Sequence, residues 1–389
     1  MKVIYLDNNA STRAADEVIE AMSPYFGELY GNPSSMHTFG GQIHRKIEFA
    51  RGQVAELINA EPEEIIFTSC GTESDNTAIM SALEANPQKK HIITTRVEHP
   101  AVLNFCKAMQ RKGYDSKYLP VDKFGRLNLN EFKTSITDNT AVVSIMYANN
   151  ETGVIFPIRE TAETAKSRGI LFHTDAVQAV GKIPLDVKKL SVDMLSISGH
   201  KLHAPKGVGA LYVRKGTRFS PYIIGGHQEA GRRAGTENVA FIIGLGKACE
   251  LAGKHIDEEG ARIKAMRDRL EQGLLKSCPN ARINGDAEMR LSNTTNISFE
   301  YVEGEAILLR LNEYNVCASS GSACTSGSLE PSHVLRAMGV PFTAIHGSIR
   351  FSLSIYNKDE EVDFVLQKMP EIIKELRELS PYGREAMRG

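Results

Sequence analysis

The chain has 389 residues, with 46 Lys and Arg against 47 Asp and Glu, so its formal net charge is −1. This balance argues against a protein that binds nucleic acid through a general basic surface, and against an acidic disordered tail. Hydrophobic residues make up 42% and charged residues 24%, which is usual for a folded protein long enough to form two or three domains.

No segment approaches the roughly 18 consecutive apolar residues of a membrane span, and the first residues lack the apolar core of a secretory signal. The six cysteines are scattered, without a CxxC pair or the spacing of a zinc site. We therefore expect a cytoplasmic protein with reduced thiols that binds neither a membrane nor a nucleic acid.

Strands and helices alternate through the first two thirds of the chain. Apolar runs predict strands at residues 64–68, 91–95, 141–147, 170–173, 194–198 and 207–213. Segments of helical period lie between them, for example at 77–85, 101–111 and 158–168. This order is typical of an α/β protein whose mostly parallel sheet is covered on both faces. Such proteins bind ligands at the carboxyl ends of their strands, and polar residues directly follow these strands.

After about residue 239 the strict alternation ends. The pattern predicts helices at 251–275, 305–312 and 359–379, strands at 296–299 and 348–353, and a Ser- and Gly-rich loop at 318–328. A smaller α+β domain fits this order better than a continuation of the parallel sheet.

Two residues at predicted strand ends suggest a Schiff-base cofactor. Lys201 follows the strand at 194–198, and a lysine at a buried strand end is costly unless it is neutral, paired or covalently engaged. Taken alone, such a lysine is more often a solvated loop residue. Asp175 ends another strand, where a carboxylate can hold the ring-nitrogen proton of a pyridoxal cofactor or simply cap a helix.

Three further strand ends carry polar candidates. Gly71 and Thr72 open a helix, where free backbone N–H groups can bind phosphate, although these residue types also serve as ordinary caps. His99 can stack on a planar ring or be a simple strand-end residue. Asn150 can bind a substrate carboxylate or form a turn.

The C-terminal part adds a cysteine and an arginine. Cys324 lies in the Ser- and Gly-rich loop, where a nucleophile that moves into a site and an incidental surface cysteine are both reasonable. A free thiol has a pKa near about 8.5, so Cys324 would need a base or a cation to act as a thiolate. Arg350 offers a bidentate fork for a carboxylate, or a structural ion pair.

Taken together, these residues resemble the pyridoxal-phosphate-dependent cysteine desulfurases of the NifS/IscS family, and most of all the NifS type. The resemblance covers most of the chain. It rests on YLDNNAST at 5–12, GNPSSMH at 31–37, FTSCGTESDN at 67–76, EHPAV at 98–102, ANNETG at 148–153, HTDAVQAVGK at 173–182, SGHKLHAPKGVGALY at 198–212, GGHQEAGRRAGTEN at 225–238 and SSGSACTSGSLEPSHVLRAMG at 319–339.

The resemblance implies a fold and a division of the chain. The fold would be the α/β fold of type I pyridoxal-phosphate enzymes, like that of class V aminotransferases, with a mostly parallel seven-stranded sheet and a smaller α+β domain. The large, cofactor-binding domain would span residues 15–255. The small domain would comprise residues 1–14 and 256–389, and would carry the catalytic cysteine on the loop at 318–330.

The resemblance also implies a reaction, in which L-cysteine becomes L-alanine and its sulfur passes to an enzyme persulfide. The catalytic residues would be Lys201, which holds the cofactor and moves the α-proton, Cys324, which accepts the sulfur, and His99, which stacks on the ring. Asn150 and Arg350 would bind the substrate carboxylate, with Asn150 also close to the cofactor. The remaining cofactor contacts would come from Asp175 at the ring nitrogen, Gln178 at the ring hydroxyl, and Gly71, Thr72, Ser198, His200 and Thr236 at the phosphate.

Partners follow from the same resemblance. The enzyme would be a homodimer in which Thr236 reaches the phosphate of the neighbouring subunit. The sulfur would serve iron–sulfur cluster assembly, in the NifS type for nitrogenase, with a NifU-type scaffold as acceptor. Cys324 would then also be a transient ligand of a cluster shared with that scaffold.

Two enzymes on the same scaffold remain as alternatives, an aminotransferase and a selenocysteine lyase. An aminotransferase has no use for a loop cysteine, whereas a selenocysteine lyase would share the whole cofactor pocket. A sulfur-relay protein that merely carries a persulfide is a third alternative, but it would not need the lysine, aspartate and histidine set.

Overall fold

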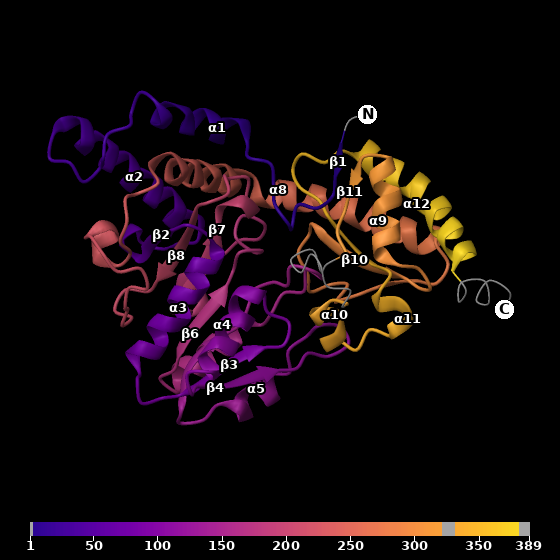
Figure 1. Cartoon of the computed structure of the whole chain (residues 1–389), viewed down its shortest axis with the longest axis horizontal. Helices are drawn as coiled ribbons and strands as arrows, with labels where there is room; N and C mark the ends of the chain where they lie inside the picture. Colours follow the sequence, from indigo (N-terminus) through magenta and orange to yellow (C-terminus); the bar gives the residue numbers. More distant parts are fainter. Residues whose placement is uncertain (1–2, 321–330, 381–389) are drawn as a thin grey trace.

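The computed structural model describes residues 3–320 and 331–380 (Figure 1). Its main element is a seven-stranded sheet. In spatial order the strands are β2 (Ile65–Thr68), β8 (Gly209–Val213), β7 (Met194–Ser198), β6 (Leu171–Asp175), β5 (Thr140–Ser144), β3 (His91–Thr95) and β4 (Asp115–Leu119). Only β8 runs against its neighbours β2 and β7, and the other pairs are parallel. The predicted mostly parallel α/β fold is confirmed.

Helices cover both faces of this sheet. Successive strand residues point to opposite faces, so that Ile66 packs in one apolar cluster with α3 (Gly71–Ala85) and α4 (Pro100–Gln110). Its neighbour Phe67 packs in the other cluster with α2 (Thr38–Leu57). The remaining helical elements around this sheet are α1 (Asp16–Met22), α5 (Leu129–Ser135), α6 (Ile158–Ser167), α7 (Val187–Leu190), and the short 3-10 turns η1 (Ser23–Phe26), η2 (Pro62–Glu64), η3 (Gly199–Lys201) and η4 (Gln228–Gly231).

A smaller sheet lies beside the first unit. Its strands are β12 (Ser348–Ser352), β10 (Thr294–Phe299) and β9 (Ala281–Ile283), all antiparallel, and β1 (Ile4–Tyr5) pairs in parallel with β11 (Val316–Cys317). The helices of this part are α9 (Gly304–Glu313), α10 (His333–Ala337), α11 (Phe342–Ile345) and α12 (Asp359–Leu379). Among the described residues, no helix has the length and apolar character needed to cross a membrane.

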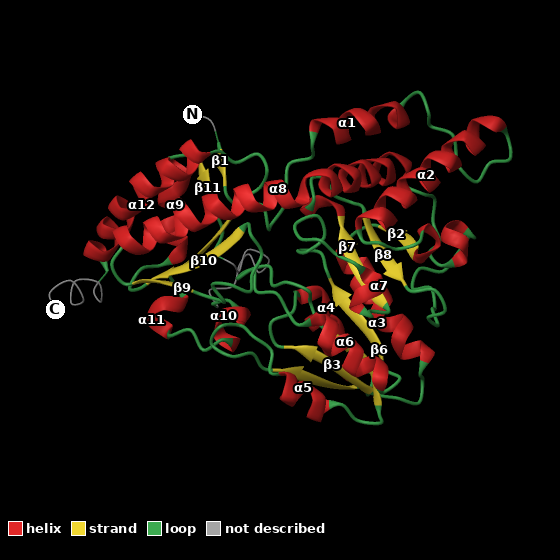
Figure 2. Ribbon diagram, turned by 180° about the vertical axis from the view of Figure 1, so that it is seen from behind, coloured by secondary structure: helices red, strands yellow, loops and turns green. Residues whose placement is uncertain are grey.

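One long helix, α8 (Val239–Ser277), joins the two parts (Figure 2). Near its start, Ile242 and Leu245 pack in the core of the large sheet, whereas Leu270 and Leu274 pack in a separate apolar cluster with the small sheet. The expected division into 15–255 and the remainder stays a prediction, because a helix that contributes to both cores marks no sharp boundary.

The predicted elements agree with the observed ones in most places. β3, β7 and α12 have the predicted bounds. β5 ends at Ser144 instead of residue 147, but Ile145 and Tyr147 still donate backbone hydrogen bonds to carbonyls of β6 residues. The prediction missed β4, and it began α8 twelve residues too late, at residue 251 instead of Val239.

Candidate active site

The ends of β6 and β7 place the first two candidates side by side. The two strands are parallel, with Asp175 in register with Ser196, so Asp175 and Ser198 lie at the same edge of the sheet. The chain then forms η3, which ends at Lys201. His99 follows β3 and caps α4, and Asn150 follows β5. The sheet therefore brings strand-end residues together at its carboxyl edge, as the sequence predicted.

Lys201 is held by the N-terminal segment of the chain. Its Nζ donates hydrogen bonds to the carbonyl oxygens of Asn9 at 2.6 Å and Ala10 at 2.7 Å. The Asn9 carbonyl also accepts a hydrogen bond from Gln178 Nε2 at 3.0 Å. Lys201 and Gln178 thus share one acceptor, although 23 residues separate them in the sequence.

The same N-terminal segment connects the site to the small sheet. Asn9 Nδ2 donates to the Asn150 carbonyl at 3.1 Å, and Arg350 Nη1 donates to that same carbonyl at 3.0 Å. Arg350 Nη2 also pairs with Asp7 Oδ1 at 2.6 Å. The Arg350 side chain is 3% exposed, and its Nε has no hydrogen-bond partner among the described residues. One buried donor of the predicted carboxylate-binding arginine is therefore unsatisfied within the described chain.

The start of α3 has the form of an anion site. A Cβ at Gly71 would lie 2.8 Å from Val177 Cγ2 and 3.4 Å from Ser198 Cβ, so only glycine lets the helix approach the turn after β6. The Cys70 side chain forms no capping hydrogen bond at this helix start, and Thr72 lies exposed in the first turn. Backbone N–H groups and a hydroxyl are thus available beside Ser198, at the positive end of a helix of 15 residues.

Of the two remaining phosphate-site candidates, His200 contacts the N-terminal segment that holds Lys201, whereas Thr236 is exposed. His200 Nδ1 lies 3.3 Å from Ser11 Oγ, and burial, together with the charge of Lys201, lowers the pKa of its imidazole to about 4. Thr236 lies exposed in the loop before α8, and its side chain makes no hydrogen bond within the described chain. The same loop is nevertheless tied to α3, because Arg233 pairs with Glu73 at 2.9 Å.

His99 has a defined orientation. Its Nδ1 accepts a hydrogen bond from the Ala101 backbone N–H at 3.2 Å, so a neutral ring carries its proton on Nε2. Burial lowers the pKa of this imidazole, Asp175 acts in the opposite direction, and Lys201 and His333 lower it further. The ring is therefore neutral at physiological pH and lies within electrostatic reach of both Asp175 and Lys201.

A cluster of buried carboxyls surrounds Asp175. Burial raises the pKa of the Asp175 carboxyl, and the nearby His99 and Lys201 counteract this effect. Asp75, on α3, is 1% exposed, and burial together with the charge of Asp175 raises its pKa well above the usual range. Glu98 is fully buried, and burial is the main cause that raises its pKa to about 8. Within the described part of the chain, none of these three acids at the sheet edge forms an ion pair with a lysine or arginine.

Sequence reasoning missed several members of this site. Asp75, Glu98 and Asn9 received no role, although all three lie inside motifs that carried the family resemblance. Glu151 was also missed. Burial raises its pKa to about 7, and its Oε2 accepts a hydrogen bond from Ser332 Oγ at 2.5 Å. Glu98 and Glu151 carried a signal, because they adjoin the candidates His99 and Asn150, whereas Asp75 and Asn9 were marked only by the motifs that contain them.

Cys324 lies outside the described residues. Of the residues that flank this part of the chain, Ser319 exchanges two backbone hydrogen bonds with Arg350, at 2.6 and 3.3 Å, and Ser332 caps α10 and contacts Glu151. Across residues 3–320 and 331–380 there is no group of three or more His, Cys, Asp or Glu placed to hold a metal ion. The expected cluster-binding role of Cys324 is not tested by this observation.

Comparison with known proteins defines the class to which this fold and site belong. The family model described as Aminotransferase class-V matches residues 4–365. The chain is 62% identical over 385 residues to a protein of Trichormus azollae named cysteine desulfurase, covering 99% of this chain and 96% of that protein. It is 59% identical over 383 residues to the cysteine desulfurase NifS of Azotobacter vinelandii, covering 98% and 95%.

Solved structures agree. A structure titled NifS-like protein superposes with a TM-score of 0.91 at 41% identity, covering 96% of this chain and all of that one. A structure titled SspA in complex with cysteine superposes with a TM-score of 0.80 at 35% identity, covering 91% of this chain and all of that one. The chain belongs to the class-V aminotransferase family and, within it, to the cysteine desulfurases.

Proposed function

We propose that this chain holds pyridoxal phosphate on Lys201 and uses it to convert L-cysteine into L-alanine, while Cys324 receives the sulfur as a persulfide. One observation supports this most directly. Lys201 Nζ lies at the carboxyl edge of the sheet, donates hydrogen bonds at 2.6 and 2.7 Å to two backbone carbonyls, and lies next to the buried acid Asp175. A lysine and an acid placed in this way suit a pyridoxal cofactor.

The described residues fit such a cofactor from end to end. The start of α3, with Gly71 and Thr72, offers N–H groups and a hydroxyl to a phosphate, and Ser198 borders it at the close approach of Gly71. Asp175 would hold the proton on the ring nitrogen. His99 would stack on the ring. Gln178, bonded through Nε2 to the acceptor it shares with Lys201, would donate to the ring hydroxyl oxygen.

When bound, the cofactor supplies an electron sink for the bonds of the α-carbon. Lys201 would then take the α-proton and return it. Arg350 and Asn150 would orient the substrate through its carboxylate, for which the buried, unpartnered Nε of Arg350 provides a donor. His99, neutral because burial lowers its pKa, would supply a proton acceptor close to Lys201.

Sulfur transfer is the role of Cys324 in this proposal. The thiolate attacks the substrate sulfur, an S–S bond forms at Cys324 and the C–S bond breaks. The carbon that loses sulfur keeps the electron pair and takes a proton, which makes it the methyl group of alanine. Only a few per cent of an ordinary thiol is ionised at neutral pH, so a base such as His99 would have to accept the thiol proton.

The quaternary structure and the acceptor are part of the same proposal. Thr236 is exposed and makes no hydrogen bond within the described chain, which suits a residue that completes the phosphate site of a second subunit in a homodimer. We further propose a cytoplasmic enzyme that passes sulfur to an iron–sulfur scaffold of the NifU type, with Cys324 as a transient cluster ligand. Transfer to such a scaffold that is no faster than release to a free thiol would contradict direct docking.

The test combines a visible spectrum with product analysis. We expect a yellow wild-type protein that releases alanine and, with a thiol reductant, sulfide in equal amounts from L-cysteine. Lys201→Ala should lose the visible band and at least about 10³-fold in turnover. Cys324→Ala should keep the band and lose sulfur transfer, whereas Cys317→Ala, the matched change of a thiol on β11, should keep both.

Two outcomes would contradict the proposal. A colourless wild type that ignores added pyridoxal phosphate would remove the cofactor. A yellow Cys324→Ala variant that still desulfurates L-cysteine would keep the cofactor and move the reaction to a lyase or aminotransferase without a persulfide.

A further inference from the structure

A second lysine contacts Gln178 from the side opposite to Asn9. Lys182 Nζ donates a hydrogen bond to Gln178 Oε1 at 2.8 Å, and Gln178 Nε2 donates to the Asn9 carbonyl at 3.0 Å. The two ends of the Gln178 amide therefore face partners of opposite polarity. Gln178 is 5% exposed, so an amide oxygen without its donor would be buried and unsatisfied.

The turn after β6 directs Lys182 back onto Gln178. Lys182 N donates to the Ala179 carbonyl at 3.0 Å, and Val180 N donates to the Ala176 carbonyl at 3.0 Å, so this segment is a hydrogen-bonded turn. Gly181 has a φ of +76°, and a Cβ there would lie 3.1 Å from Leu202 Cβ. The glycine thus permits a backbone reversal that places the two side chains, four residues apart, in contact.

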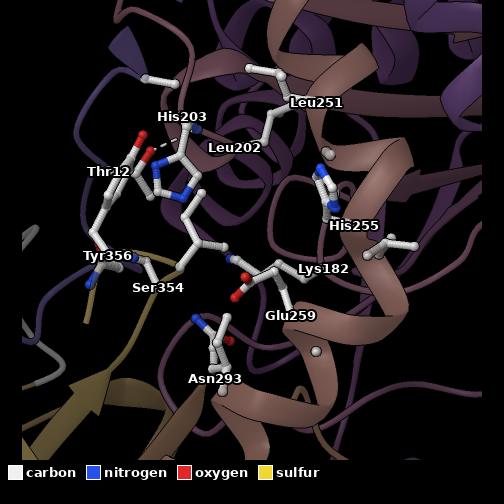
Figure 3. A pocket seen from close by; sticks show the side chains of 18 of the residues that line it. Thr12, Lys182, Leu202, His203, Leu251, His255, Glu259, Asn293, Ser354 and Tyr356 are labelled. Atoms are coloured by element: carbon white, nitrogen blue, oxygen red, sulfur yellow. Dashed lines mark hydrogen bonds between the residues drawn. The ribbon is translucent and has the colours of Figure 1, made fainter. Parts of the chain in front are cut away.

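Lys182 is an unusual residue to find at this place. It lines a cavity of about 470 Å³ between α8 and the N-terminal segment, and Figure 3 shows its amine directed into that cavity beside Glu259 and Asn293. Among the described residues no carboxylate lies within ion-pairing distance of this amine. Burial lowers its pKa to about 7, and the charges of Lys201 and Arg350 act in the same direction. The residue is half-buried, and its amine donates a hydrogen bond to Gln178.

We propose that Lys182 is a positioning residue that fixes the amide orientation of Gln178. With Lys182 bonded to Oε1, the N–H side of the amide faces the Asn9 carbonyl, where Lys201 also binds. Without that donor the amide oxygen is buried and unsatisfied, and only the single bond from Nε2 to the Asn9 carbonyl holds the amide in this orientation. The inference rests on the proposed function, because the orientation matters only if a cofactor binds beside Gln178.

A double-mutant cycle tests this proposal. Lys182→Met keeps the length of the side chain and removes its donor, and Gln178→Ala removes the amide. Each variant and the combined variant would be purified, freed of cofactor and titrated with pyridoxal phosphate, while the visible band is recorded across pH. The matched control is Lys188→Met, which changes an exposed lysine that pairs with Glu61 on the surface of the same unit.

We expect Lys182→Met to weaken cofactor binding about 5- to 10-fold and to shift the pH at which the visible band changes, the size of effect of one lost hydrogen bond. In the Gln178→Ala background the same change should have no further effect. The cofactor-free Lys182→Met protein should unfold at no lower denaturant concentration than wild type, since methionine avoids burying an amine. Lys188→Met should match wild type in all three measurements.

Three results would overturn the proposal. One is a band and a binding constant in Lys182→Met that equal those of wild type. Another is an effect of equal size in the Gln178→Ala background, which would show that Lys182 acts by another route. The third is a wild-type protein that binds no pyridoxal phosphate at Lys201, a result that would also remove the proposed function and is told apart by the absent band.

Discussion

Two groups of buried acids differ in their partners although their burial is equal. At the edge of the large sheet, Asp75 and Glu98 are 1% and 0% exposed, and one carboxyl oxygen of each accepts no hydrogen bond from the described residues. Beside the small sheet, Glu271 is 2% exposed, but Arg290 holds it with two hydrogen bonds, at 2.6 and 2.7 Å. Asp286, also 2% exposed, pairs with Arg126, which lowers its pKa to about 2.

The difference teaches where this molecule places its chemistry. An acid that is buried with a basic partner stabilises the packing around it only as long as the partner remains. Burial of an acid without a basic partner raises the pKa of the acid and lowers the stability of the fold. Such acids are usually found at functional sites. The edge of the large sheet therefore has the properties of a functional site. The small sheet is mainly structural, and it contributes Arg350 to that site.

Breaking the paired group should have the largest effect on stability. Arg290→Met leaves the Glu271 carboxylate buried without its cation, and we expect the free energy of unfolding to fall by about 3–5 kcal/mol. Denaturant titration of the cofactor-free protein measures this. The combined variant Arg290→Met with Glu271→Leu should recover most of the loss. An unchanged midpoint in the single variant would mean that the pair does not hold the small sheet in place.

Changing Asp175, the third buried acid at the edge of the large sheet, should affect activity instead. In Asp175→Asn the side chain can still accept the hydrogen bond from the Val177 N–H, which is 2.9 Å long in the wild type, but it can no longer hold a ring proton through a negative charge. We expect turnover of L-cysteine to fall by about 10²-fold or more, with stability unchanged or higher. Steady-state kinetics and denaturant titration of the same preparation check both. Normal turnover would place the ring nitrogen elsewhere.

The two groups should also respond to pH with opposite signs. Burial raises the pKa of Glu98 to about 8, so the folded state keeps a proton that the unfolded chain releases above its ordinary pKa near 4.5. Stability therefore falls as pH rises through this window, by up to about 1.4 kcal/mol per pH unit, and Glu98→Gln should remove this slope. Asp286 behaves in the opposite way, because its stabilisation is present above pH 4 and is lost as pH falls toward 2.

Denaturant titrations of cofactor-free protein at pH 5, 6.5 and 8 measure the Glu98 slope. The other buried acids are the same in wild type and variant, so the difference between the two curves isolates Glu98. Asp286→Asn is the matched control, and should differ from wild type only below about pH 4. Parallel wild-type and Glu98→Gln curves between pH 5 and 8 would show that Glu98 is ionised in the folded state.

The sequence predicted the strand ends well, and the reason is physical. A strand buried on both faces is a continuous apolar run, and the polar residues after it are those at the sheet edge. β4 was missed because its sequence, DSKYL, is that of an edge strand with exposed polar residues. The first twelve residues of α8 were missed because they begin with the apolar run VAFII, which is equally typical of a strand.

Contacts between distant segments were beyond the reach of the sequence. The Asn9 carbonyl meets Lys201 across 192 residues, and no local pattern marks an asparagine as the acceptor for a lysine. Lys182 reads as an ordinary turn lysine until the neighbouring segments bury it. The sequence could not predict that Asp75 and Glu98 are buried without a basic partner for the same reason, because burial and ion pairing depend on the packed structure.

The smallest predicted effect concerns a residue that belongs to neither group of acids. Asn128 caps α5 through its Oδ1, which accepts hydrogen bonds from the N–H groups of Asn130 at 2.9 Å and Glu131 at 3.2 Å. Asn128→Ala should lower the free energy of unfolding by about 1 kcal/mol. Turnover should not change, because α5 packs against α6 and against β4, the edge strand of the large sheet, and Asn128→Asp, which can cap equally well, should restore the stability. A loss of turnover in Asn128→Ala would mean that a small change in stability at α5 reaches the residues at the carboxyl edge of the large sheet. Residues that support the fold and residues that take part in the reaction could then not be separated.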